Sequence, residues 1–137
     1  MEIKFHNMGY TTKPFKAHEN DAGYDVFARV DTYIPAHTVI KVPLGFGVDV
    51  PAGCMANVYP RSGKSLQGLL PQLPPIDCGY TGEVHAIVLN TNFFDVTVKA
   101  NDKIGQLVFV PIMHFNLVED IVDNRGDGAF GSTDRVQ

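Results

Sequence analysis

Residues 83–90 read EVHAIVLN, residues 95–100 read DVTVKA and residues 106–112 read QLVFVPI. These runs are rich in β-branched and aromatic residues and are bounded by turn-forming residues, which is typical of β-strands. Four earlier segments, 2–6, 24–29, 39–42 and 45–50, alternate apolar and polar residues. Nine prolines and thirteen glycines punctuate the sequence, and only residues 62–70 favour a brief helical turn. The sequence therefore predicts an all-β sandwich or barrel.

Length and composition point to one β domain with a C-terminal arm. The chain has 137 residues, which suits a single domain that buries roughly two-thirds of its unfolded surface. No linker, repeat or low-complexity segment divides the sequence. We expect a β domain over residues 1–120 and a flexible arm over residues 121–137.

Charge and hydropathy exclude several classes of protein. The formal net charge is −4 without any basic run, which argues against nucleic acid as a partner. No apolar run is long enough to span a membrane and no charged-then-apolar leader opens the sequence, so we expect a cytoplasmic protein without membrane contact. Cys54 and Cys78 lack the spacing of a metal site or a disulfide framework, and we expect each to be a small buried or half-buried residue.

The arm carries groups suited to binding a nucleotide. Residues 125–133 read RGDGAFGST, in which glycines let backbone N–H groups approach an anion, and Arg125, Ser132 and Thr133 add donors. The ring of Phe130 is suited to stacking on a base. Too few residues follow the last glycine for the helix that a dinucleotide-binding turn requires. The arm is predicted to be a phosphate-binding lid, with a disordered terminus as the alternative.

Two internal segments place polar groups beside predicted strands. Asp25 interrupts an otherwise apolar strand start, and a buried carboxylate needs a cation, metal-bound water or several N–H donors nearby. Both a structural ion pair and a functional role fit Asp25. Residues 60–65, PRSGKS, combine two cations, two hydroxyls and a glycine. This composition suits a phosphate cradle and equally an ordinary polar turn, because it lacks the full P-loop pattern.

Two further segments contain candidate site residues. Residues 76–84 read as a tight hairpin with Asp77 and Tyr80 at its bend, where Asp77 is a candidate to deprotonate a water. The other interpretation of Asp77 is an acceptor in an Asx-turn. Gln106 stands among apolar neighbours and needs a partner in the protein or on a ligand. The five histidines show no metal-binding spacing, and each is expected on the surface or in packing.

Taken in order, five segments resemble the motifs of the trimeric deoxyuridine triphosphatase (dUTPase) family. The family's A-x-x-D-[LV]-x-A corresponds to residues 22–28, P-R-S-G to residues 60–63, I-D-x-x-Y-x-G-E to residues 76–83, D-[KR]-I-x-Q-[LV] to residues 102–107, and R-G-x-G-x-F-G-S-T to residues 125–133. One such motif is weak evidence, whereas five in the same order are specific.

The resemblance implies a fold, an assembly and a reaction. The expected fold is a distorted jelly-roll, a form of β-sandwich. The expected assembly is a homotrimer whose three active sites are each built from all three subunits, with each C-terminal arm closing over a neighbour's site. The expected enzyme is a dUTP diphosphatase that hydrolyses dUTP to dUMP and pyrophosphate with Mg²⁺ as cofactor.

The resemblance also implies residue roles. Asp77 is the general base for water attacking the α-phosphorus, and Tyr80 packs against the deoxyribose and excludes a 2′-hydroxyl. Asp25 holds a water on Mg²⁺, while the metal itself is bound mainly by substrate phosphates. The other implied substrate-binding residues are Ser62, Gly63 and Gln106 at the phosphates, with Arg61 bracing the site. In the arm they are Arg125, Ser132 and Thr133 at the γ-phosphate and Phe130 over uracil, with Gly131 beside them in the motif.

Some positions depart from the family pattern. Pro74 and Pro75 stand where the family commonly has a glycine, and they lack the N–H groups with which this hairpin normally reads uracil. Gly79 replaces a second aspartate, and Ala129 replaces a glycine in the arm. Base recognition in this chain is therefore expected to differ in detail.

Two alternatives accompany this interpretation. The first is a dCTP deaminase on the same fold, but its glutamate falls on Ile87, which cannot shuttle protons, so hydrolysis is favoured. The second is a nucleotide-gated regulatory binding module. The presence of Asp77 and Arg125 favours an enzyme, although a regulatory protein partner is compatible with the sequence.

Overall fold

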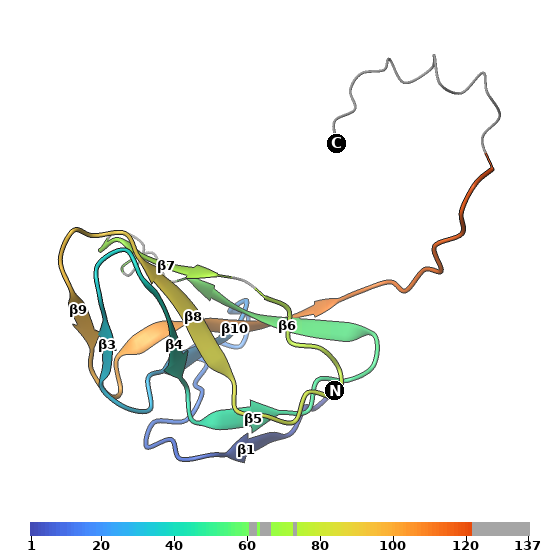
Figure 1. Ribbon diagram of the computed structural model, residues 1–137. Coiled ribbons are helices and arrows are strands. Elements are labelled where there is room, and N and C mark those ends of the chain that lie inside the picture. The colour runs from blue at the N-terminus through green and yellow to red at the C-terminus, as the bar shows by residue number, and fades with distance from the viewer. Residues whose placement is uncertain (61–62, 64–66, 73, 122–137) are drawn as a thin grey trace.

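The computed structural model describes residues 1–60, 63, 67–72 and 74–121, of which residues 71 and 72 are described by their backbone alone. The elements of this part of the chain are β-strands (Figure 1). They are β1 Phe5–Asn7, β2 Tyr24–Phe27, β3 Thr32–Ile34, β4 Val39–Pro43, β5 Phe46–Val48, β6 Cys54–Pro60, β7 Leu69–Gln72, β8 His85–Asn90, β9 Val96–Val98 and β10 Lys103–Pro111. The predicted all-β fold class is confirmed.

The strands form antiparallel sheets whose neighbours come mostly from distant parts of the sequence. One three-stranded sheet has the order β2-β10-β6 and another has the order β4-β8-β7. In addition, β1 pairs with β5 and β3 pairs with β9. Among these pairs only β7 and β8 are consecutive, so the topology is that of a jelly-roll sandwich and not a chain of hairpins.

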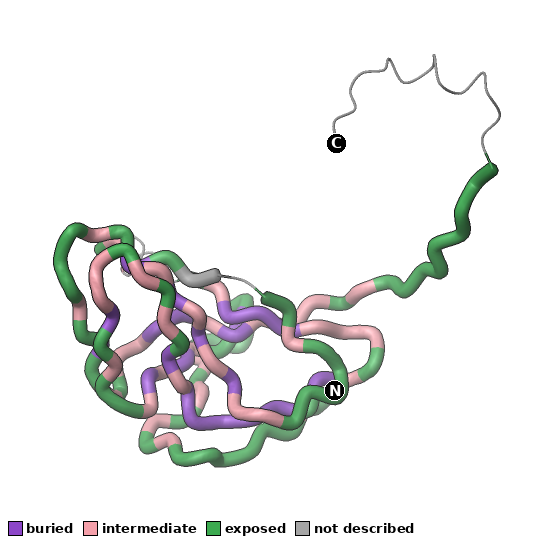
Figure 2. The backbone as a smooth tube through the Cα atoms, in the orientation of Figure 1, coloured by how far each residue is buried: buried purple, intermediate pink, exposed green. Residues whose placement is uncertain are grey.

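One hydrophobic core joins the two three-stranded sheets (Figure 2). Strand β8 shows why the sequence folds in this way: every second residue from Ala86 onward is buried, whereas His85, Ile87 and Leu89 are half-buried. This alternation is expected for a strand with one face on the core. The core side chains of the two sheets include Val26, Ala56, Val58 and Leu107 from the first and Val42, Leu69, Ala86 and Val88 from the second.

A surface hydrogen bond ties the β3–β9 pair to the adjoining loop. The hydroxyl of Tyr33 donates to the carboxylate of Asp95, which also accepts the backbone N–H of Ala36 at 2.9 Å. The bond from Tyr33, followed by that from Ala36, holds the pKa of Asp95 below its ordinary value. Bonding to Asp95 in turn raises the pKa of Tyr33.

The predicted strands agree with the observed ones more closely at their centres than at their ends. Strand β1 begins at Phe5 and not at residue 2, and β5 ends at Val48 and not at residue 50. The helical turn expected over residues 62–70 is wrong at its end, because Leu69 and Leu70 begin β7. Leu69 pairs with Asn90 of β8 and is 2% exposed, so pairing and burial decide its conformation over local propensity.

The two cysteines are free, and they differ in exposure. Cys54 is half-buried at the start of β6, as expected. Cys78 is exposed, which contradicts the expectation that it is buried or half-buried. Its place in the turn after Ile76, outside every strand, keeps it off the core.

Beyond β10 the described chain leaves the body of the molecule (Figures 1 and 2). This segment, residues 112–121, carries several large apolar side chains that are almost fully exposed: Met113 at 79%, Phe115 at 76%, Leu117 at 99%, Val118 at 85% and Ile121 at 93%. The rest of the predicted arm, residues 122–137, lies outside the described residues. No helix in the described part is long and apolar enough to cross a membrane.

Candidate active site

A row of polar residues crosses the β2-β10-β6 sheet. Gln106, on the central strand, is directly opposite Asp25 on one side and Tyr59 on the other. Residues directly opposite each other in antiparallel strands present their side chains on the same face. The structure thus brings together Asp25 and Gln106, which the sequence placed in separate motifs.

Asp25 has a cationic partner within the chain. Its Oδ2 lies 3.2 Å from Nζ of Lys103, and the Asp25 side chain is 28% exposed. The prediction that the Asp25 carboxylate is buried is therefore wrong: the side chain is half-buried, because this face of the sheet is partly open to solvent. The expectation of a nearby cation is confirmed, and a water-exposed edge of the carboxylate is left for other ligands.

The predicted phosphate segment begins at the end of the same sheet. Pro60, the last residue of β6, is opposite Gly105. A Cβ at Gly105 would come 2.2 Å from the carbonyl oxygen of Tyr59, so only glycine permits this close approach of β10 to β6. Gly63 is half-buried and its carbonyl accepts the N–H of Gln67 at 3.2 Å. Arg61 and Ser62 lie outside the described residues.

Asp77 occupies an exposed turn on the other edge of β6. Ile76 forms a bridge with Ala56, and the carbonyl of Asp77 accepts the N–H of Tyr80 at 3.2 Å. Gly79 has φ +91°, the left-handed conformation that favours glycine in a turn. The predicted bend is confirmed, but it does not join a simple hairpin. Its flanks pair with other strands, since Val84 bonds to Phe46 and Leu44 in place of Ile76.

Tyr80 is held over the turn by a specific contact. Its hydroxyl donates to the carbonyl of Glu83 at 2.8 Å, and the side chain is 45% exposed. The ring lies against Gly82, where a Cβ would come 2.6 Å from the Tyr80 hydroxyl oxygen. The ring is therefore fixed in place and remains partly open to solvent.

Glu83 connects this turn to two other parts of the fold. Its Oε2 accepts from Nε of Arg29 at 2.9 Å and from the backbone N–H of Gly45 at 2.7 Å. Its carbonyl accepts from Tyr80 and lies 3.0 Å from Nδ1 of His85. Because these bonds converge on one residue, Glu83 fixes the end of the Asp77 turn. No role was expected for Arg29 from the sequence, and in the structure its side chain holds Glu83.

A cavity of about 140 Å³ opens beside Tyr80. Its walls include Pro74 and Pro75. They also include three residues from the outer face of the β4–β8 pair, which are Lys41, His85 and Ile87. From the sequence, Pro74 and Pro75 were expected to alter base recognition and Tyr80 to pack against the sugar. His85 was expected on the surface or in packing, and Lys41 had no assigned role. The register of β4 and β8 brings Lys41 and His85 to this cavity, and their spacing in the sequence gives no sign of it.

The same cavity bears on the deaminase alternative. Ile87, where a deaminase glutamate was expected, lines the cavity and offers no carboxylate. Glu83 also lines it, but its carboxylate is engaged by Arg29 and Gly45. Among the described lining residues, no carboxylate is free to shuttle protons to a base.

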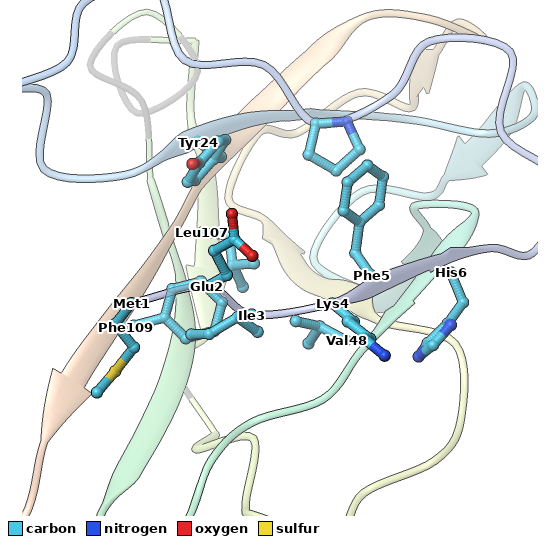
Figure 3. Close-up of a pocket in the computed structure, with 11 residues that line it drawn as sticks. Met1, Glu2, Ile3, Lys4, Phe5, His6, Tyr24, Val48, Leu107 and Phe109 are labelled. Atoms are coloured by element: carbon cyan, nitrogen blue, oxygen red, sulfur yellow. The ribbon is translucent and has the colours of Figure 1, made fainter.

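A larger cavity, of about 650 Å³, lies elsewhere on the molecule (Figure 3). The N-terminal residues 1–6 form one wall, and Tyr24, Val48, Leu107 and Phe109 form much of the other. None of the predicted site residues that the structure describes lines it. The candidate active site is therefore placed at the smaller cavity, which adjoins Tyr80 and the Asp77 turn.

The described residues offer little to hold a metal ion by themselves. In this part of the chain no group of three or more His, Cys, Asp or Glu side chains is placed to bind a metal. Asp25 contributes one partly exposed carboxylate. Magnesium commonly takes one or two carboxylates, several waters and substrate phosphates, so this donor set fits an ion that arrives with a phosphorylated substrate.

The remaining predicted site residues belong to the C-terminal arm. Arg125, Phe130, Gly131, Ser132 and Thr133 all lie outside the described residues. Their roles remain predictions from the sequence.

Comparison with known proteins identifies the family. The dUTPase family model matches residues 10–134. The deoxyuridine 5′-triphosphate nucleotidohydrolase of Gloeobacter violaceus is 38% identical over 128 residues, which cover 88% of this chain and 87% of the relative. The protein of the same name from Paramecium bursaria Chlorella virus 1 is 36% identical over 126 residues, which cover 89% of each chain.

Solved structures show the same fold. The dUTPase from phage phi11 of S. aureus superposes with a TM-score of 0.83 at 20% identity, covering 90% of this chain and 99% of that one. The dUTPase of Staphylococcus bacteriophage 80alpha gives a TM-score of 0.79 at 20% identity, covering 89% and 99%. With the five motifs, the fold and these relatives in agreement, the chain belongs to the dUTPase family.

Proposed function

We propose that this chain hydrolyses dUTP to dUMP and pyrophosphate, with Asp77 as the general base. The observation that carries the proposal is the exposed Asp77 turn, whose end is fixed by Tyr80 and Glu83 beside a small cavity. Family membership supplies the reaction, and this turn supplies an accessible carboxylate next to a ring suited to a sugar.

Hydrolysis of a phosphoanhydride needs an oriented water, an in-line geometry and neutralised charge. Asp77 accepts a proton from the water as it attacks the α-phosphorus, and pyrophosphate leaves. General-base assistance of this kind is worth roughly 10²–10⁴ in rate. Tyr80 packs against the deoxyribose and leaves no room for a 2′-hydroxyl.

The polar row of Asp25 and Gln106 is assigned to the phosphates. Gln106 donates its amide N–H groups to phosphate oxygens, and Asp25 is the residue that would hold Mg²⁺ through a water. Mg²⁺, when bound with the substrate, neutralises charge on the phosphate oxygens. Ser62 and Gly63 bind the same phosphates, Arg61 braces the site, and the arm residues Arg125, Phe130, Gly131, Ser132 and Thr133 close over the substrate.

The active unit is proposed to be a homotrimer. Along β6, the residue opposite the Asp77 turn is Ala56, whereas the residue opposite Gln106 is Tyr59. At about 3.3 Å per residue, the two places are on the order of 10 Å apart within one chain. They also lie on different edges of β6, which is consistent with sites that combine the turn of one subunit with the polar row of another.

Measuring pyrophosphate release from dUTP with Mg²⁺ tests the proposal. We expect Asp77→Asn to lower kcat by about 10²–10⁴ while dUMP binding stays nearly unchanged, because the amide keeps the shape and loses the base. Asp31→Asn, at an exposed aspartate that accepts a backbone bond, is the matched control and should match the wild type. Retention of near-normal turnover by Asp77→Asn would refute the assignment of the base.

A further inference from the structure

We infer that Lys41 and His85 form a recognition pair for the pyrimidine base, selecting the keto edge of uracil against the amino edge of cytosine. The inference rests on the proposed function, because it names base-reading groups in the same site. Both residues line the cavity beside Tyr80.

The order of groups in a nucleotide places the base in this cavity. The sugar lies between the α-phosphate and the base, so a base must lie beyond Tyr80 when the phosphate is at Asp77. The cavity adjoins Tyr80, and Pro74, Pro75 and Ile87 give it apolar walls. An apolar cleft with a few polar groups is the usual form of a site for a flat ring.

The proline wall cannot read the donor and acceptor pattern of the base in full. Pro74 and Pro75 have no N–H group to donate. The carbonyl of Pro74 already accepts from Nδ2 of Asn57 at 3.2 Å. Side chains on the opposite wall must therefore make the hydrogen bonds that distinguish one base from another.

Lys41 and His85 stand on that wall in neighbouring positions. In the β4–β8 ladder Lys41 is opposite Ile87 and His85 is opposite Pro43. Lys41 and His85 are therefore diagonal neighbours on one face of the sheet, about 7–8 Å apart at the backbone and within reach of the same ligand for long side chains. Lys41 is exposed and His85 is half-buried, so both are reachable from the cavity.

The contacts of His85 determine which ring nitrogen accepts a hydrogen bond. Its Nδ1 lies 3.0 Å from the carbonyl oxygen of Glu83. A carbonyl only accepts, so Nδ1 carries the hydrogen and the neutral ring keeps its lone pair on Nε2. Nε2 is 4.0 Å from Oε1 of Glu83, beyond hydrogen-bond distance. In the described part of the chain Nε2 makes no hydrogen bond, so it is available as an acceptor.

The pair matches uracil and mismatches cytosine at two adjacent positions. Uracil presents a carbonyl oxygen at C4 and an N–H at N3, which meet the donor-only ammonium of Lys41 and the acceptor Nε2 of His85. Cytosine presents an amino group at C4 and an unprotonated N3. It would place a donor against Lys41 and an acceptor against Nε2, and unpaired polar groups in a site are strongly discriminating.

The test compares dUTP with dCTP in pyrophosphate release, and dUMP with dCMP in calorimetric binding. Lys41→Met and His85→Phe keep side-chain bulk and remove the polar groups. Each is expected to lower the dUTP-to-dCTP ratio of kcat/KM, and the dUMP-to-dCMP ratio of affinity, about tenfold. Lys41→Arg keeps a donor and should keep most of the selectivity. Lys99→Met and His18→Phe, at exposed positions outside the cavity, should match the wild type, and thermal unfolding checks that each variant is folded.

The outcomes separate this inference from the proposed function. If the wild type hydrolyses dUTP and both variants keep the two ratios within about twofold, the recognition pair is wrong and the hydrolase assignment stands. If the wild type fails to hydrolyse dUTP, the proposed function fails. In that case the nucleotide-binding ratios still decide whether Lys41 and His85 read the base.

Discussion

At the scale of single residues, Tyr80 shows how a glycine fixes a neighbouring ring. The Tyr80 hydroxyl reaches the Glu83 carbonyl because Gly82, between them, has no side chain. We expect Gly82→Ala to displace the ring, since its Cβ would lie 2.6 Å from the hydroxyl oxygen and 2.8 Å from Cζ. Discrimination of dUTP from UTP should fall about tenfold, because the displaced ring no longer blocks the position that the 2′-hydroxyl of UTP would occupy.

The same substitution should have little effect on stability. The clash is with the far end of a side chain and not with the backbone, and the lost hydrogen bond is worth about 0.5–1.5 kcal/mol. Urea unfolding and kcat/KM for dUTP and UTP measure the two effects separately. Unaltered discrimination between the two nucleotides would mean that Tyr80 does not border the sugar.

At the scale of elements, Arg29 links the end of β2 to the segment that carries the active-site turn. Its Nε bonds Glu83 at 2.9 Å with side chains 33% and 19% exposed. Arg29→Met should lower the free energy of unfolding by about 1.5–3 kcal/mol, the usual value for a hydrogen bond to a charged group. Glu83→Gln and the double variant complete a cycle that measures the coupling.

An exposed ion pair provides the comparison for Arg29. Lys99 and Asp31 are 4.0 Å apart with side chains 69% and 62% exposed, and Lys99→Met should cost less than about 1 kcal/mol. Equal losses of stability from Arg29→Met and Lys99→Met, measured by urea unfolding, would show that the Glu83 contacts do not brace the turn.

The elements also show where sequence reasoning succeeds and where it stops. Strand β8 was predictable because a short run rich in β-branched residues, bounded by turn-forming residues, marks a strand. Strand β3 has only three residues, too few for a pattern, and β7 depends on pairing with β8. Pairing between distant strands leaves no local signal, so neither the polar row of Asp25 and Gln106 nor the Glu83 contacts could be derived from spacing.

Some residues of the candidate site were likewise predictable from the sequence, and others were not. The motifs identified Asp77 and Tyr80, and the structure places them on one turn. The cavity wall of Lys41 and His85 arises from strand register, since Lys41 is opposite Ile87 and shares its face with His85. A histidine read alone in the sequence gives no sign of that neighbour.

At the scale of the whole molecule, the exposed apolar side chains beyond β10 indicate a surface that binds a partner. Phe115 and Leu117 are 76% and 99% exposed on a segment that leaves the body. Exposed apolar groups gathered in this way mark an interaction surface, and burying them releases about 25 cal/mol per Å². We expect another subunit of the proposed homotrimer to cover them.

Replacing both residues tests this assignment. The double variant Phe115→Asp, Leu117→Asp should fold as a single chain but fail to assemble, because two carboxylates cannot be buried unpaired in an apolar contact. Sedimentation equilibrium should give three times 15.0 kDa for the wild type and 15.0 kDa for the variant, and dUTP turnover should fall with assembly. Phe93→Asp, at a residue 91% exposed on the loop before β9, should remain trimeric. A wild type that sediments as one chain would refute the trimer, and a trimeric double variant would show that this segment is not the contact.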